Sequence, residues 1–274
     1  HLPCYIGMMI DKRNGVFSIV ALSAAIKILL ILPLATESFS PSTQAAFTPL
    51  SRLIVRNTNT PVVLEKETPA DELQDGIKNC KTMQEINDIW QKYETQMKPF
   101  YVGFSWNQVS RILSDYKEVA KVKREPETLT PLLRLTNETC REMNRGSLAI
   151  TSHRMAKMSA KLNLPIDSAL WKGIASRATE MTEYNEQQIS NTLWAFAKAK
   201  QKDQLLFDHF ADLGLEKLGT FKPQDISNTL WSYATLRHAS PKLFNTAAEE
   251  AIKKMNKFEI WQISNTLWSY ATLR

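Results

Sequence analysis

The 274-residue chain is hydrophobic at 43% of its positions, which is enough to bury a sizeable core and argues against a disordered protein. It contains only 8 glycines beside plentiful helix-forming residues, which argues against an all-β protein rich in tight turns and favours an all-helical one. The net charge of +6 does not by itself indicate a polyanionic ligand: residues 1–64 hold five Lys or Arg against two Asp or Glu, whereas residues 181–274 hold eleven against ten.

The first predicted element is a signal-peptide-like targeting segment over residues 1–46. Lys12 and Arg13 precede an apolar stretch over residues 16–35, which is the layout of a signal peptide. A transmembrane helix is the alternative, because such a helix needs about twenty apolar residues. Lys27 lies near the middle of the stretch and favours the signal peptide, so we expect no stable membrane insertion of the mature chain.

Residues 47–76 are predicted to be a transit-peptide-like segment followed by a linker. Residues 38–64 contain no acidic side chain and are rich in Ser, Thr and Asn, as transit peptides are. The sequence Ala-Ala-Phe-Thr-Pro at 45–49 resembles the cleavage motif of bipartite plastid pre-sequences, which implies the plastid (chloroplast stroma) as the destination. Phe39 marks a second candidate junction, and a mitochondrial presequence leading to the matrix, or plain secretion, remain alternatives. Folding is predicted to begin near Ile77.

An internal repeat dominates the C-terminal third. The hexapeptide Ile-Ser-Asn-Thr-Leu-Trp occurs three times at a constant spacing of 37 residues, at 189–194, 226–231 and 263–268. The stretch 226–237 is identical to 263–274. Chance does not produce such a pattern, so residues 181–274 are predicted to form repeats of about 37 residues.

Two fainter copies lie upstream, around Ser110 and Ser152. The serines of the five copies are then spaced 42, 38, 37 and 37 residues apart. Residues 77–180 are therefore predicted to be a helical region of divergent repeats. The chain stops within a repeat at Arg274, so we expect it to be a fragment.

Each repeat is predicted to contain two helices. Pro223 opens helix A, which runs to about Arg237; Ser240 and Pro241 supply the N-cap and first turn of helix B, which spans residues 243–255. One face of helix A is apolar, at Ile226, Leu230, Tyr233 and Ala234. One unit alone cannot cover that face, so the fold class is predicted to be an all-α, right-handed α-solenoid of helix pairs.

The opposite face of helix A is polar and is predicted to be the binding site. In the three clear repeats the candidate residues are Gln188, Asn191 and Lys198; Asp225, Asn228, Ser232 and Thr235; and Gln262, Asn265, Ser269 and Thr272. Short amide and hydroxyl side chains read the edges of unpaired bases, which indicates single-stranded RNA as the ligand. The asparagines may equally be satisfied by neighbouring repeats, and both interpretations stay open. The tryptophans at 194, 231 and 268 are interpreted as core residues.

No enzyme chemistry is indicated. The chain has no phosphate-binding loop, dinucleotide-binding turn, zinc-protease helix or nucleophile elbow. Its four histidines are scattered, and His238 is interpreted as a surface turn residue. Glu249 and Glu250 lie beside Lys253 and Lys254, a spacing typical of solvated pairs on a helix surface. Three widely separated cysteines suggest neither disulfides nor a metal site, so we expect no cofactor, metal or small-molecule substrate.

The units resemble octotricopeptide repeats. The resemblance rests on the start Pro223-Gln224-Asp225 and on the core Asn228-Thr229-Leu230-Trp231-Ser232-Tyr233-Ala234, and it covers residues 186–274. It implies an organellar RNA-binding factor that acts in processing, stability or translation of plastid or mitochondrial transcripts, similar to FAST-kinase-like and RAP-domain proteins. Other organellar RNA-processing proteins would then be its partners.

A protein-interaction scaffold of the tetratricopeptide type, without RNA binding, is the competing hypothesis. A peptide groove should carry Lys or Arg clamps, or apolar pockets, at matched positions of every repeat. The polar face instead varies between repeats, through Ala195 and Lys198 in the first clear unit. This variation favours RNA.

Overall fold

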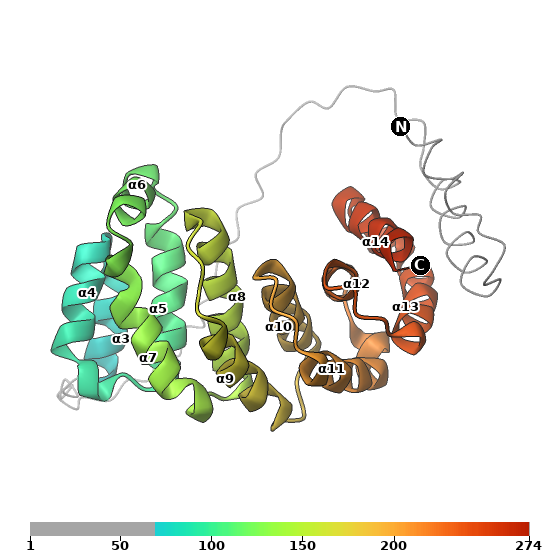
Figure 1. The fold of residues 1–274 in the computed structure, drawn as a ribbon, viewed down its shortest axis with the longest axis horizontal. Helices are drawn as coiled ribbons and strands as arrows, with labels where there is room; N and C mark the ends of the chain where they lie inside the picture. The colour runs from blue at the N-terminus through green and yellow to red at the C-terminus, as the bar shows by residue number, and fades with distance from the viewer. Residues whose placement is uncertain (1–68, 274) are drawn as a thin grey trace, which may run out of the picture.

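The computed structural model describes residues 69–273, and this part of the chain is helical throughout, with no β-strand (Figure 1). The expectation of an all-α protein is confirmed for these residues. The targeting segment over 1–46 and the plastid-type junction lie outside the described residues. The α-helices are α3 Pro69–Asn79, α4 Met83–Lys92, α5 Pro99–Ile112, α6 Tyr116–Arg124, α7 Thr130–Thr139, α8 Arg145–Leu162, α9 Ser168–Thr179, α10 Glu186–Lys198, α11 Gln204–Lys217, α12 Pro223–Thr235, α13 Pro241–Lys253 and α14 Ile260–Thr272.

The helical part begins earlier than the sequence suggested. Helix α3 starts at Pro69, so the prediction of a linker as far as residue 76 was wrong. The prediction failed because Pro69 and the acidic residues after it were taken as linker signals, whereas proline and acidic side chains also suit the first turn of a helix. Leu73 and Ile77 of α3 are buried in the core, which holds this helix against α4 and α5.

The helices form two rows. Helices α5, α8, α10, α12 and α14 pack side by side and make the most extensive helix–helix contacts of the described residues; we call them the A helices. Helices α9, α11 and α13 contact one another in a second row, each packed on the A helix before it. Figure 1 shows the row of pairs curving, with α11 and α13 on the outer side of the curve and α10, α12 and α14 on its inner side.

Local sequence explains where an A helix begins and ends. Pro223 occupies the first turn of α12, where its missing N–H costs nothing. The end comes at Thr235, because Arg237 adopts a left-handed backbone (φ 51°) and the His238 N–H donates back to the Tyr233 carbonyl at 2.9 Å. The expected helix pair is thus confirmed within two residues, but the Ser240 side chain makes no capping hydrogen bond to α13.

Hydrogen bonds from equivalent residues join successive units. The Ser190 hydroxyl donates to the Asp225 carboxylate at 2.8 Å, and the Ser227 hydroxyl donates to the backbone carbonyl of Gln262 at 3.2 Å. The Tyr233 hydroxyl donates to the Phe207 carbonyl at 2.6 Å, and Tyr270 repeats this contact with Phe244 at the same distance. Ser190 and Ser227 of the hexapeptide are therefore buried packing residues, as expected, with an additional bond to the next A helix, whereas Ser264 is exposed.

The upstream units have a different register from the one inferred from their serines. The N-caps of the five A helices are Lys98, Asn144, Asn185, Lys222 and Glu259, which are 46, 41, 37 and 37 residues apart. Ser110 and Ser152 lie twelve and eight residues after their N-caps, whereas Ser227 lies five after its own. The spacing of 42 and 38 was therefore wrong. At the fifth position the A helices carry only small residues, which let them approach closely: Gly103, Ala149, Ser190, Ser227 and Ser264.

Candidate functional site

One strip of the A helices remains open to solvent. It consists of the sixth, ninth and thirteenth residues after each N-cap, which lie on one helix face because they are three and four residues apart. All fifteen of these side chains are at least partly exposed. We call this strip the A-row surface: Phe104, Asn107 and Arg111; Ile150, His153 and Lys157; Asn191, Trp194 and Lys198; Asn228, Trp231 and Thr235; Asn265, Trp268 and Thr272.

The sixth position of the last three A helices forms an amide column of Asn191, Asn228 and Asn265. Each side chain is half-buried, and within the described residues none of the three amides has a hydrogen-bond partner. A neighbouring repeat therefore does not satisfy them. An asparagine amide offers two N–H donors and a carbonyl acceptor, so the column presents unused hydrogen-bonding capacity at equivalent points on adjacent helices.

The ninth position forms a ring column of His153, Trp194, Trp231 and Trp268. The centroids of the His153 and Trp194 rings lie 4.7 Å apart with an interplanar angle of 40°, and those of Trp194 and Trp231 lie 6.4 Å apart at 31°. Trp268 is 39% exposed, and the other two tryptophans are half-buried. The interpretation of these tryptophans as core residues was wrong, since none of the three is fully buried, although Trp194 packs partly against the core.

Charge is distributed unevenly among the A helices. The five A helices together contain six Lys or Arg but only two acidic residues, Glu186 in a first turn and the buried Asp225. Four of the six basic residues belong to α8. No carboxylate belongs to the A-row surface, while Arg111, Lys157 and Lys198 occupy its thirteenth position. The basic excess of the A helices therefore comes from α5 and α8, since α10, α12 and α14 hold Lys198 against Glu186 and Asp225.

His153 lies between the two nearest positive charges of this surface. Burial lowers the pKa of its imidazole to about 4, and the charges of Arg154 and Lys157 lower it further in the same direction. Arg154 is held in place, since its Nε donates to the Asn107 side-chain oxygen at 2.8 Å. His153 is consequently an uncharged ring at neutral pH, and it contributes an aromatic face rather than a positive charge.

Five residues of the predicted polar face have structural partners instead. Gln188, Asp225 and Gln262 are the third residues of their helices, and the side-chain oxygen of each accepts the N-cap N–H at 3.0–3.1 Å. Ser232 and Ser269 are fully buried, and each hydroxyl donates to the carbonyl four residues earlier at 2.7 Å. The prediction that this face lines a groove was wrong for Asp225, Gln262, Ser232 and Ser269, which are buried.

The other predicted residues do reach the surface. Asn191, Asn228, Asn265, Lys198, Thr235 and Thr272 all belong to the A-row surface. The Thr272 hydroxyl donates to the Trp268 carbonyl at 2.8 Å, whereas the Thr235 hydroxyl is buried and finds no partner in the described part of the chain. The remaining members of the A-row surface were not predicted: Phe104, Asn107, Arg111, Ile150, His153, Lys157 and the three tryptophans. Counting from the N-cap, rather than from the serine, would have aligned His153 with Trp194.

Two groups interpreted as surface features are structural. His238 is buried, and its Nε2 lies 2.8 Å from the Asp208 carboxylate, so it connects the end of α12 to α11. The Lys254 ammonium donates to the carbonyls of Gly219 and Phe221 at 2.7 and 2.8 Å and lies 3.4 Å from Glu250. This pair is therefore not a solvated one, and its lysine caps the segment that follows α11.

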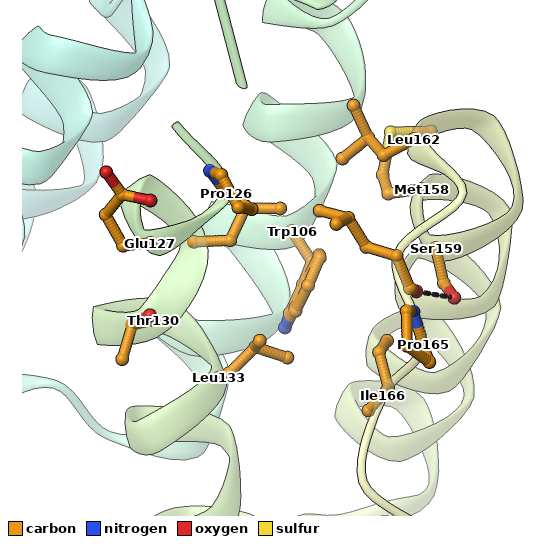
Figure 2. Close-up of a pocket in the computed structure, with 12 residues that line it drawn as sticks. Trp106, Pro126, Glu127, Thr130, Leu133, Met158, Ser159, Leu162, Pro165 and Ile166 are labelled. Carbon is orange, nitrogen blue, oxygen red and sulfur yellow. Dashed lines mark hydrogen bonds between the residues drawn. The ribbon is translucent and has the colours of Figure 1, made fainter. Parts of the chain in front are cut away.

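An apolar cavity lies away from the A-row surface. It has a volume of about 240 Å³ and lies between α5, α7 and the end of α8. Figure 2 shows Trp106 at its centre, with Pro126, Leu133 and Ile166 around it. The Ser159 hydroxyl on its wall already donates to the Leu164 carbonyl, and the Trp106 Nε1 donates to Thr136. The cavity thus lacks the converging free polar groups of a typical substrate site.

The described residues hold no group of three or more potential metal ligands. In the same part of the chain, no helix is both long and apolar enough to cross a membrane. Burial raises the pKa of the Cys80 thiol to about 11 and that of the Cys140 thiol above its ordinary value, which keeps both in the unreactive protonated form at neutral pH.

Comparison with known proteins gives one family. The sequence model of the RNA-editing substrate-binding complex 6 protein matches residues 135–274, about half of the chain. The match extends from α7 to α14, so it includes α8, where the resemblance to octotricopeptide repeats is weak. The matched family is not the octotricopeptide repeat family. A comparison with curated proteins finds no match.

Proposed function

The chain belongs to the RNA-editing substrate-binding complex 6 protein family, and from this premise we propose that it is a non-catalytic subunit that binds single-stranded RNA in an RNA-processing assembly. The ligand-binding site is the A-row surface. The mitochondrial matrix is the proposed compartment, because the RNA-editing substrate-binding complex is mitochondrial. This assignment replaces the plastid stroma, which rested on a short motif at residues 45–49.

The observation that carries the proposal is the amide column. Asn191, Asn228 and Asn265 occupy one position on three adjacent helices, are partly exposed and have no hydrogen-bond partner among the described residues. A half-exposed amide can hydrogen-bond to water. What favours a ligand is the recurrence, because the same unused amide lies at the same position of three adjacent helices, where one extended ligand can contact all three. Amides read the base edges that an unpaired strand exposes, whereas the major groove of duplex RNA is too narrow for side chains and its minor groove is recognised mostly by shape.

The helix pairs are proposed to form a right-handed solenoid in which each unit contacts one base. Support comes from α10, α12 and α14, which begin at Glu186, Pro223 and Ile260, and from the inter-unit bonds of Tyr233 and Tyr270. Each repeats after 37 residues, as stacked units of one design require. The octotricopeptide type of repeat is proposed for residues 186–274 on the motif alone.

A protein-interaction scaffold fits the A-row surface less well. A groove that clamps peptides should present a charge clamp in each unit, whereas the thirteenth position changes from Arg111, Lys157 and Lys198 to Thr235 and Thr272. Other subunits of the RNA-processing assembly are nevertheless proposed as partners. The second row, whose helix α11 exposes Asp212 and Glu216, offers them a separate surface.

The test is RNA binding by the full chain and by a triple variant, Asn191→Ala, Asn228→Ala and Asn265→Ala. Alanine forms helices better than asparagine does, so the variant should fold. Each lost hydrogen bond contributes about 1 kcal/mol, so affinity for single-stranded RNA should fall by roughly 100-fold. Asn245→Ala on α13 is the matched control, because Asn245 is half-buried but lies on the second row.

Salt dependence and duplex competitors complete the experiment. The three basic side chains of the A-row surface predict a slope of log affinity against log salt of about −2, at roughly 0.7 per phosphate of a single strand. Duplex RNA and duplex DNA of equal length should compete poorly. A folded protein that binds no RNA, or that prefers the duplexes, would contradict the proposal and favour the scaffold.

A further inference from the structure

The ring column is the second feature of the A-row surface that needs an explanation. Trp194, Trp231 and Trp268 repeat at the ninth position of three helices, although the core does not require an indole there. The same position carries His153 in α8 and Asn107 in α5, and those helices also pack on each other in the A row. Half-exposed indoles in a row cost hydration free energy, which indicates that they serve a contact outside the described chain.

We infer that the ring column is a stacking platform for the bases of a single-stranded RNA, which deepens the proposed function and depends on it. Base stacking on aromatic rings tolerates any sequence, because every base has a π-face. The column therefore supplies affinity that does not depend on sequence, while the amide column beside it reads base edges. Trp194 and Trp231 are tilted by 31° and so do not cover each other's faces as parallel stacked rings would.

Three features around the ring column favour a nucleic acid as its ligand. No carboxylate belongs to the A-row surface, so a polyanion meets no repulsion along the column. Lys157 and Lys198 each follow a ring by four residues on their helices, one turn away, where they reach a phosphate whose base lies on that ring. His153 is uncharged at neutral pH and its ring lies 4.7 Å from that of Trp194 between centroids, which extends the aromatic surface onto α8.

The positions of the other tryptophans give the column a spectroscopic signature. The chain has 7 tryptophans, of which Trp90, Trp106 and Trp171 are fully buried and three form the ring column. The remaining one, Trp261, is 43% exposed in the first turn of α14, outside the column. In a Trp261→Phe background, only column indoles are accessible to a bound base, so quenching of fluorescence reports stacking on them.

The experiment titrates the Trp261→Phe protein with oligouridylate, with oligoadenylate and with an abasic strand that has the same number of phosphates. Stacking predicts quenching by both RNAs and similar affinities for them. The abasic strand should bind at least ten-fold more weakly and should not quench. The double variant Trp194→Leu and Trp231→Leu should lose about 5-fold or more in affinity for each ring removed. Trp261→Leu is the control, and its affinity for both RNAs should equal that of the protein without substitutions.

The outcomes separate this inference from the proposed function. Binding of RNA with equal affinity for the abasic strand and without quenching would overturn the stacking platform and leave RNA binding in place. Absence of any RNA binding by the unaltered protein would overturn both, and the column would then be assigned to a protein partner. The quenching and abasic measurements use unsubstituted column residues, so they decide the matter even if the double variant unfolds.

Discussion

Acidification should destabilise the protein through His153. Burial and two neighbouring positive charges lower the pKa of its imidazole to about 4, whereas an unfolded chain leaves histidine near 6.5. Below pH 6.5 the unfolded state therefore binds a proton that the folded state does not. The free energy of unfolding falls as the pH decreases from 6.5 to 4. Below pH 4, His153 causes no further decrease.

The size of the effect follows from the two pKa values. At pH 5 the unfolded imidazole is almost fully protonated and the folded one is largely neutral, which removes about 2 kcal/mol of stability. The complete shift corresponds to about 3 kcal/mol. Most small domains have only about 5–15 kcal/mol in total, so the change should be readily measurable.

Urea unfolding of the full chain at pH 7 and at pH 5, followed by helical circular dichroism, measures the prediction. His153→Gln keeps a polar side chain and removes the titrating group, so the difference in stability between the two proteins should change by about 2 kcal/mol between these pH values. Other titrating groups are common to both proteins and cancel. An unchanged difference would refute the reasoning and show that His153 becomes protonated in the folded state without penalty.

Two further substitutions test the bonds between units. Tyr233→Phe removes the inter-unit hydrogen bond to the Phe207 carbonyl, which keeps its partner within helix α11, and should cost about 0.5–1.5 kcal/mol in urea unfolding, while Tyr116→Phe, at an exposed position, should cost nothing. Lys254→Met removes an ammonium from two carbonyls that follow α11 and should cost about 1.5–3 kcal/mol. Lys253→Met is its control, since Lys253 makes only an exposed ion pair; equal losses at both lysines would disprove the capping role.

The helices of the clear repeats were predictable because local signals coincide there. Pro223 and Pro241 fix two helix starts, and the apolar period of α12 agrees with them. Identical sequence at a 37-residue offset then transfers the assignment to α14. In the upstream region these signals do not coincide. Helix α8 contains Ser152 but has no proline at its start. Its first residue is instead indicated by the N-cap Asn144, whose side chain accepts the Ser147 N–H at 2.9 Å.

The exposed strip was not predictable from a helical wheel. A wheel divides a helix into an apolar and a polar face, but an A helix such as α12 is packed on three sides, by α10, α13 and α14. The side neighbours cover Asp225 and Ser232, polar residues that have internal partners. They leave open a strip that includes Trp231. Which side chains of an A helix remain exposed therefore depends on which helices pack beside it.

Structural and ligand-facing residues thus alternate along the same helix turn. In α12 the third, fifth and eleventh positions, Asp225, Ser227 and Tyr233, make the hydrogen bonds that join units. The sixth and ninth, Asn228 and Trp231, make none and face outward. Because the joining bonds fix how each A helix is rotated against the next, they also align the amide and ring columns. Substitutions at the joining positions should therefore lower the affinity for a ligand that contacts several units more than the affinity for a ligand that contacts one unit.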